Sequence, residues 1–177
     1  MKKLPLFAGI LFLFMACQEN KVPAVSSDTK KDSTSTENKE ERNKKIVMES
    51  IEGFTSNNLD LVLKDAAPDM VDYGDGTTAA VKGIDSLRAA LNSWLSNLKD
   101  YKADNLKLYA DGDYVLAYGD WSGTFKNDIM GLKTKDKSFK VTDVDIFKLN
   151  DQGKIFEHRN VQAVNTIINQ ALDKTKK

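Results

Sequence analysis

The stretch that most constrains the fold runs from Lys137 to Val164 and has the pattern of two long antiparallel strands. Residues 138–149 and 154–164 are both rich in β-branched and aromatic side chains, and both alternate in character. The residues between them, 150–153, read Asn-Asp-Gln-Gly, a composition that favours a turn. The sequence therefore predicts a long β-hairpin in this part of the chain.

Candidate chemical groups gather in this hairpin. The sole histidine, His158, lies in the second arm, and two carboxylates, Asp143 and Asp145, lie in the first. A two-residue turn at 151–152 would place Asp145 opposite His158, with the neighbouring pairs Phe147–Phe156 and Asp143–Asn160 on the same face. An Asp beside a His favours imidazolium and orients it for proton transfer. A bulged three-residue turn ending in Gly153 would shift this register. The alternative without function is a polar cluster whose members only bond to one another, or one that faces solvent.

The rest of the chain supplies helices first and strands later. Apolar residues at helical spacing predict a helix from about Glu40 to Phe54, and a second helix over 59–67 that Pro68 ends. Gly83 precedes a strongly amphipathic third helix. The further predicted elements are a small hairpin (70–73 and 77–81), strands 101–110 and 114–125, a loop 126–136 and a terminal helix 165–174. This order predicts an α+β fold.

The N-terminus has the pattern of an export signal. Met1-Lys2-Lys3 is positively charged, and residues 4–16 are almost wholly apolar but too short to span a bilayer comfortably. Cys17, the only cysteine, follows Ala16 directly, which resembles the lipobox of bacterial lipoproteins. We therefore expect a signal peptide over 1–16, lipidation of Cys17, a disordered tether over 17–40 and a folded domain over 41–174. An ordinary signal peptide followed by an incidental cysteine is the alternative.

Composition excludes several classes of function. Lys+Arg and Asp+Glu are both 26, so the formal net charge is zero and a nucleic-acid partner is not expected. One cysteine and one histidine exclude an internal disulfide and the multi-Cys or multi-His zinc sites. We expect neither a metal nor a cofactor.

Several short segments together resemble the SnoaL-like branch of the nuclear-transport-factor-two-like superfamily. The resemblance covers most of residues 44–172. It rests on Asn58-Leu59-Asp60, Ala67-Pro68-Asp69, Lys82-Gly83-Ile84, Asp120-Trp121-Ser122-Gly123-Thr124, Asp151-Gln152-Gly153-Lys154-Ile155 and Glu157-His158. It implies a cone-shaped, strongly curved antiparallel sheet wrapped around N-terminal helices, with an internal pocket.

The resemblance also implies where a ligand would bind. Candidate ligand-binding residues are Tyr73, Trp94, Trp121, Phe147, Phe156 and Asn160, although core packing is the favoured explanation for Trp94. Members of this branch include cyclases, isomerases, dehydratases, epoxide hydrolases and binding modules, so the fold does not settle function. Catalytic relatives often carry an acid on the last strand, and here Asn160 occupies that position. An amide does not take up a proton near neutral pH.

Two classes of function follow. One is a lipid-anchored, non-catalytic module of the cell envelope that binds a small, largely apolar molecule or a partner protein. The other is a small-molecule lyase, isomerase or cyclase that uses Asp143, Asp145 and His158. Thr142, Val144 and Ile146 form an apolar face opposite the expected pocket, which predicts a homodimer.

Overall fold

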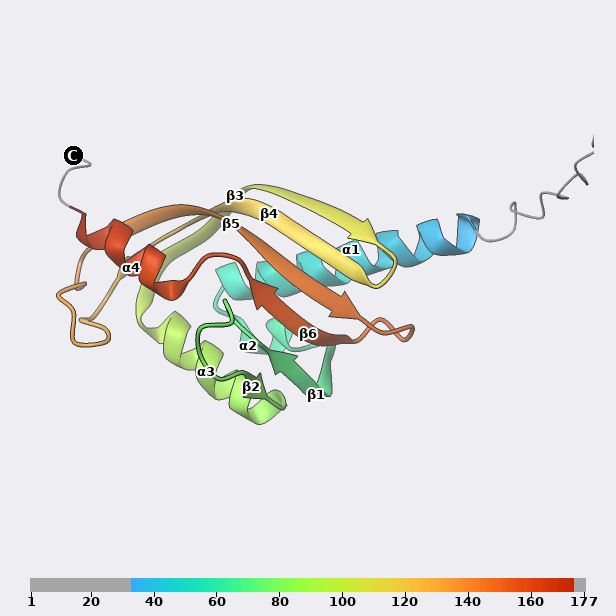
Figure 1. Ribbon diagram of the computed structural model, residues 1–177, viewed down its shortest axis with the longest axis horizontal. Helices are drawn as coiled ribbons and strands as arrows, with labels where there is room; N and C mark the ends of the chain where they lie inside the picture. The colour runs from blue at the N-terminus through green and yellow to red at the C-terminus, as the bar shows by residue number, and fades with distance from the viewer. Residues whose placement is uncertain (1–32, 174–177) are drawn as a thin grey trace, which may run out of the picture.

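The computed structural model describes residues 33–173, in which helices lie against the concave side of a curved six-stranded sheet (Figure 1). Cys17, the predicted signal peptide and most of the predicted tether lie outside the described residues. The elements are α1 (Ser33–Thr55), α2 (Leu59–Val62), β1 (Ala66–Asp72), β2 (Val81–Lys82), α3 (Ile84–Ser96), β3 (Leu98–Asp111), β4 (Tyr114–Phe125), β5 (Ser138–Leu149), β6 (Ile155–Asn160) and α4 (Val164–Leu172).

The sheet has the strand order β2-β1-β6-β5-β4-β3 and does not close on itself. The predicted α+β class, with a curved sheet around N-terminal helices, is confirmed. The sheet is mixed, however, because β1 pairs with β6 in parallel while its other neighbouring strands are antiparallel. This parallel pair joins strands far apart in the sequence, and it determines what surrounds the histidine.

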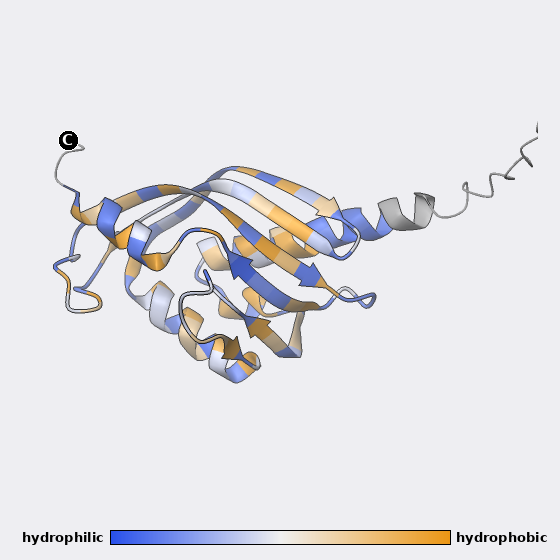
Figure 2. Cartoon of the chain, in the orientation of Figure 1, coloured by the Kyte–Doolittle hydropathy of each residue, from blue (hydrophilic) through white to orange (hydrophobic). Residues whose placement is uncertain are grey.

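Burial alternates along β4 and β5 and divides the sheet into two faces. Along β5 the hydropathy colouring in Figure 2 alternates as well. The predicted bounds of both strands are confirmed. Their inward side chains are buried in the main core: Val115, Ala117, Trp121, Val141, Phe147 and Leu149. Outward side chains form an outer apolar patch, defined as Tyr109, Leu116, Tyr118, Val144 and Ile146. The predicted outward direction of Val144 and Ile146 is therefore confirmed.

The beginning of α1 is fastened to two hairpin turns. Asn43 is fully buried and donates to the carbonyl of Gly112 at 3.2 Å, and Glu40 accepts from the amide of Gly112 at 3.0 Å. Arg42 donates to the carbonyl of Asp151 at 2.8 Å. The helix begins at Ser33, earlier than the predicted Glu40. These contacts to the β3–β4 and β5–β6 turns hold the residues near position 40 against the end of the sheet.

Gly53 allows α1 to cross the backbone of α2 at close range. A Cβ at this position would lie 2.6 Å from the amide nitrogen of Val62 and 3.0 Å from the carbonyl oxygen of Asn58.

The second helix is a single turn, and the prediction that it extends to residue 67 is wrong. Its continuation joins β1 instead, where Ala66 pairs with Ile155 of β6, so sheet pairing overrides the local helical pattern.

The remaining elements close the two ends of the sheet. β2 pairs with the end of β1, so the predicted small hairpin is present, but its second strand is only two residues long and residues 73–80 form the loop. α3 follows Gly83 as predicted. α4 packs beside the start of β5, where the amide side chain of Gln170 bonds the backbone of Lys140 in both directions. No helix within residues 33–173 is both long and apolar enough to cross a bilayer.

Candidate functional site

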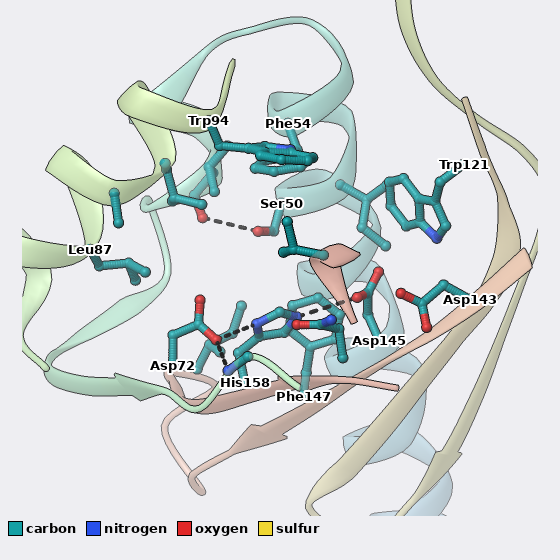
Figure 3. Close-up of a pocket in the computed structure, with 18 of the residues that line it drawn as sticks. Ser50, Phe54, Asp72, Leu87, Trp94, Trp121, Asp143, Asp145, Phe147 and His158 are labelled. Atoms are coloured by element: carbon teal, nitrogen blue, oxygen red, sulfur yellow. Dashed lines mark hydrogen bonds and ion pairs between the residues drawn. The ribbon is translucent and has the colours of Figure 1, made fainter. Parts of the chain in front are cut away.

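A pocket of about 310 Å³ lies between the concave face of the sheet and helices α1 and α3 (Figure 3). Its walls are mainly apolar and aromatic, with contributions from Ile51, Phe54, Leu87, Leu91, Trp94, Trp121, Phe147 and Ile155. Three carboxyl groups, those of Asp72, Asp143 and Asp145, and the imidazole of His158 also line it. An apolar cavity in which a few polar groups converge is the usual form of a small-molecule site.

His158 is held between two carboxylates. Its Nδ1 lies 3.0 Å from Oδ1 of Asp72, and its Nε2 lies 3.5 Å from Oδ1 of Asp145. The three side chains are 19%, 20% and 15% exposed, respectively, so solvent screens these interactions little. The ring of Phe147 packs against the imidazole at a centroid distance of 4.8 Å. Both ring nitrogens are therefore engaged within the protein.

This arrangement keeps the imidazole positively charged. Burial lowers the pKa of His158, but the carboxylates of Asp145 and Asp72 outweigh burial and raise the pKa from 6.5 to about 10. Burial likewise raises the pKa of the Asp72 carboxyl, but His158 and the amide of Gly74 outweigh it and leave the pKa below its ordinary value. His158 is thus an imidazolium at neutral pH and cannot act as a base in that state.

Asp143 differs from Asp72 in its surroundings. Its Oδ1 accepts hydrogen bonds from the amides of Val144 at 2.7 Å and Gln162 at 2.8 Å. The residue is 8% exposed, and burial together with the nearby charge of Asp145 raises the pKa of its carboxyl despite these bonds. A carboxyl with a raised pKa facing an apolar cavity is suited to exchange a proton with a bound molecule.

The predicted contact between Asp145 and His158 is present, but the predicted register is wrong. Phe147 lies opposite His158, and Asp145 lies opposite Asn160. A bulge between the pairs Lys148–Glu157 and Leu149–Ile155 leaves Phe156 as an extra residue in β6. Asp145 consequently reaches His158 diagonally across the two strands.

The structure places four of the six proposed ligand-binding residues in the pocket: Trp94, Trp121, Phe147 and Asn160. Phe156 does not line it, since the bulge turns the ring outward, where the ammonium of Lys148 lies 5.4 Å from its centroid. Tyr73 is also outside the pocket, beneath the guanidinium of Arg159 at 3.9 Å. Regular alternation counted back from His158 would place Phe156 inward, which is why the prediction for Phe156 is wrong. Tyr73 lies outward because it directly follows Asp72, which the parallel pairing of β1 places beside His158.

Asp72 is the residue that sequence reasoning missed. It is the last residue of β1 and lies opposite His158 across the parallel pair. The signal in the sequence is only its place at the end of a short apolar strand. Within residues 33–173, no group of three or more His, Cys, Asp or Glu side chains is arranged to hold a metal ion.

The fold and sequence have clear relatives. Residues 45–171 match the family described as SnoaL-like polyketide cyclase. A proposed SnoaL-like polyketide cyclase from Jannaschia sp. CCS1 superposes with a TM-score of 0.67 at 18% identity, covering 75% of this chain and 93% of the other. For a proposed polyketide cyclase from Xanthomonas campestris pv. campestris, the TM-score is 0.65 at 20% identity, with 75% and 98% covered.

A third structure, IdmH from Streptomyces antibioticus, is itself a proposed polyketide cyclase. It has a TM-score of 0.59 at 21% identity and covers 73% of this chain and 97% of its own. No curated protein matches the sequence significantly. At these identities the structural likeness establishes the fold alone, whereas the family match extends over most of the chain. The chain therefore belongs to the SnoaL-like polyketide cyclase family.

Proposed function

We propose that this protein binds a small, largely apolar molecule in the pocket. The observation that carries this proposal is the cavity itself, about 310 Å³ in volume and walled mainly by apolar side chains from the sheet, α1 and α3. Such a volume left empty would forfeit packing contacts along its whole lining, and a ligand restores them. The imidazolium between two carboxylates is already satisfied internally, which favours a binding role for the site over a role for His158 as a base.

The experiment that tests binding compares two tryptophan substitutions on α3. Ala89 and Ala90 are both exposed, but only Ala90 lines the pocket. Native mass spectrometry of protein purified from its own host should show a small molecule bound to wild type and to Ala89→Trp, but not to Ala90→Trp. Absence of any bound species, or equal retention by both variants, would contradict the proposal.

Proton-transfer catalysis is the second candidate function, and Asp143 favours it. A buried carboxyl with a raised pKa beside Asp145 is a suitable acid or base for a lyase, isomerase or cyclase. If the bound molecule exchanges a carbon-bound hydrogen with solvent, Asp143→Asn should slow solvent deuterium incorporation by about a hundredfold or more. Asp120→Asn, on the outer face, is the matched control. An unchanged exchange rate in Asp143→Asn would rule out this catalytic role and leave binding as the only proposed function of the pocket.

We further propose that the protein is anchored to the cell envelope through lipid on Cys17. The support is the charged start, the apolar run and Ala16 directly before the only cysteine. Intact-mass analysis of the membrane fraction should find a mature chain that begins at an acylated Cys17. Cys17→Ser should lack the acyl mass and leave the membrane fraction. A soluble mature wild-type chain with another N-terminus would refute the anchor.

The outer apolar patch supports a proposal of homodimerisation. Tyr109, Leu116 and Tyr118 are 58%, 37% and 42% exposed, which is costly for neighbouring apolar side chains on one sheet face. Sedimentation of the folded domain at micromolar concentration should give a dimer, and Leu116→Glu should give a monomer. Met130→Glu, in the β4–β5 loop and 73% exposed, is the control and should remain dimeric. A monomeric wild type would rule this interface out.

A further inference from the structure

The indole of Trp121 carries a hydrogen-bond donor that has no partner. Trp121 is 5% exposed and lines the pocket, yet its Nε1 atom is the one buried side-chain nitrogen or oxygen within the described residues that makes no hydrogen bond. Buried polar groups in native proteins are almost always paired, because an unmade bond costs the full desolvation of the group. An unpaired N–H in the wall of a cavity is therefore explained most simply by a partner that arrives with the ligand.

The indole is held in place by its neighbours. The ring of Tyr101 stacks on it with a centroid distance of 5.9 Å and an interplanar angle of 24°. Val141 lies directly opposite Trp121 on β5, and Asp143 is the next inward residue along that strand, opposite Gly119. Figure 3 shows Trp121 and Asp143 together along the strand-lined wall, and both residues line the pocket.

The charges around this donor select among possible ligands. Three carboxyl groups and one imidazolium line the pocket, and none of the described lysines or arginines does so. A carboxylate or phosphate ligand would therefore meet carboxyl groups without a free cation to pair with, and its desolvation would go uncompensated. An uncharged oxygen avoids this cost and still accepts a hydrogen bond.

We propose that Trp121 is a specificity-determining residue, whose indole N–H donates to a carbonyl or ether oxygen on an uncharged and otherwise apolar ligand. This inference rests on the proposed binding function and adds the chemical class of the ligand. The only other tryptophan, Trp94, also lines the pocket, but of the two indoles only that of Trp121 has a buried N–H without a hydrogen-bond partner.

The test uses three probes of similar shape with the intact protein: acetylnaphthalene, isopropenylnaphthalene and naphthoate. The first two differ only in replacing a carbonyl oxygen by a methylene group. Wild type should bind the ketone about five- to tenfold more tightly than the alkene, the ratio expected for one hydrogen bond. Naphthoate should bind more weakly than the ketone. Trp121→Phe keeps an aromatic ring but should abolish the ketone preference.

Trp94→Phe is the matched control and should change both affinities together while preserving their ratio. Nuclear magnetic resonance gives an independent readout, because wild type has only two indole N–H signals and Trp121→Phe assigns them. The ketone should shift the Trp121 signal more than the alkene does. A ketone preference that survives Trp121→Phe, or preferred binding of naphthoate, would overturn this inference while leaving small-molecule binding intact. If no probe binds and purified protein also carries no ligand, the proposed function itself fails.

Discussion

Replacing His158 with phenylalanine should lower the free energy of unfolding at pH 7 by about 3–5 kcal/mol, the loss typical of breaking a buried ion pair. The ring of phenylalanine fills most of the space beside Phe147, so the main loss is electrostatic. Asp72 and Asp145, 20% and 15% exposed, would be left without the imidazolium between them. Urea unfolding followed by circular dichroism measures this change directly.

Two further variants make this prediction specific. The carboxylate of Glu157 lies on the same strand and pairs with Arg159 on the outer side. Glu157→Gln should therefore lower the free energy of unfolding by no more than about 1 kcal/mol. Adding Asp72→Asn and Asp145→Asn to His158→Phe should recover part of the lost stability, because no uncompensated charge remains. A cost below about 1 kcal/mol for His158→Phe would mean that the charged cluster does not stabilise the fold.

The same cluster predicts how stability depends on pH. Since the folded-state pKa of His158 is raised from 6.5 to about 10, its contribution is complete below pH 6.5 and is lost as the pH rises through 10. Asp72 has a lowered pKa, so its contribution is present above pH 3.8 and is lost as the pH falls through the lowered value. The imidazole signals of this sole histidine should therefore remain those of imidazolium at pH 8. Asp145→Asn and Asp72→Asn should each lower the pKa of His158, and an unchanged titration in both would dismiss the contacts.

Gly53→Ala should destabilise the protein by about 3 kcal/mol, toward the upper end of the range for overpacking. In an isolated helix the same substitution would stabilise by up to about 1 kcal/mol, since alanine favours helix more than glycine does. Here the added Cβ meets backbone atoms of α2, including the amide of Val62 at 2.6 Å, and backbone cannot rotate away as a flexible side chain would. Thermal and urea unfolding both report the loss.

The adjacent Glu52→Ala is the control for Gly53→Ala. Glu52 is exposed on the same helix, so its replacement should change the free energy of unfolding by less than about 0.5 kcal/mol. A neutral or stabilising Gly53→Ala would show that α1 and α2 separate easily and that the close crossing is not required.

The strands whose bounds the sequence predicted most accurately are those with one buried and one exposed face. Burial alternates over the twelve residues of each of β4 and β5, and in β5 the sequence itself alternates between apolar and polar residues. The bounds of β4 follow from the turn before Tyr114 and the loop after Phe125. The short helix before Pro68 was overextended, because nothing in the local pattern shows that Ala66 will pair with Ile155 some ninety residues later. Local signals predict elements well, but long-range pairing decides where they stop.

The candidate site was predictable to the extent that it lies within the hairpin. Asp143, Asp145 and His158 share one face there, as alternation suggested, and all three line the pocket. Asp72 was not predictable, since it enters through a parallel pairing between strands that no turn connects. The diagonal contact between Asp145 and His158 was not predictable either, because a bulge in a run of β-forming residues has no distinct sequence pattern.

Because of the bulge at Phe156, the number of residues in β6 does not by itself decide which of its side chains line the cavity. Ile155, His158 and Asn160 all line the pocket, although Ile155 and His158 are three residues apart. Deleting Phe156 would restore strict alternation and leave these three side chains inward. Flattening the bulge while keeping Phe156 would instead turn Glu157 and Arg159 inward, adding a guanidinium to an acidic chamber. Loss of residue 156 would thus leave the chemistry offered to a ligand unchanged, whereas loss of the bulge alone would change it.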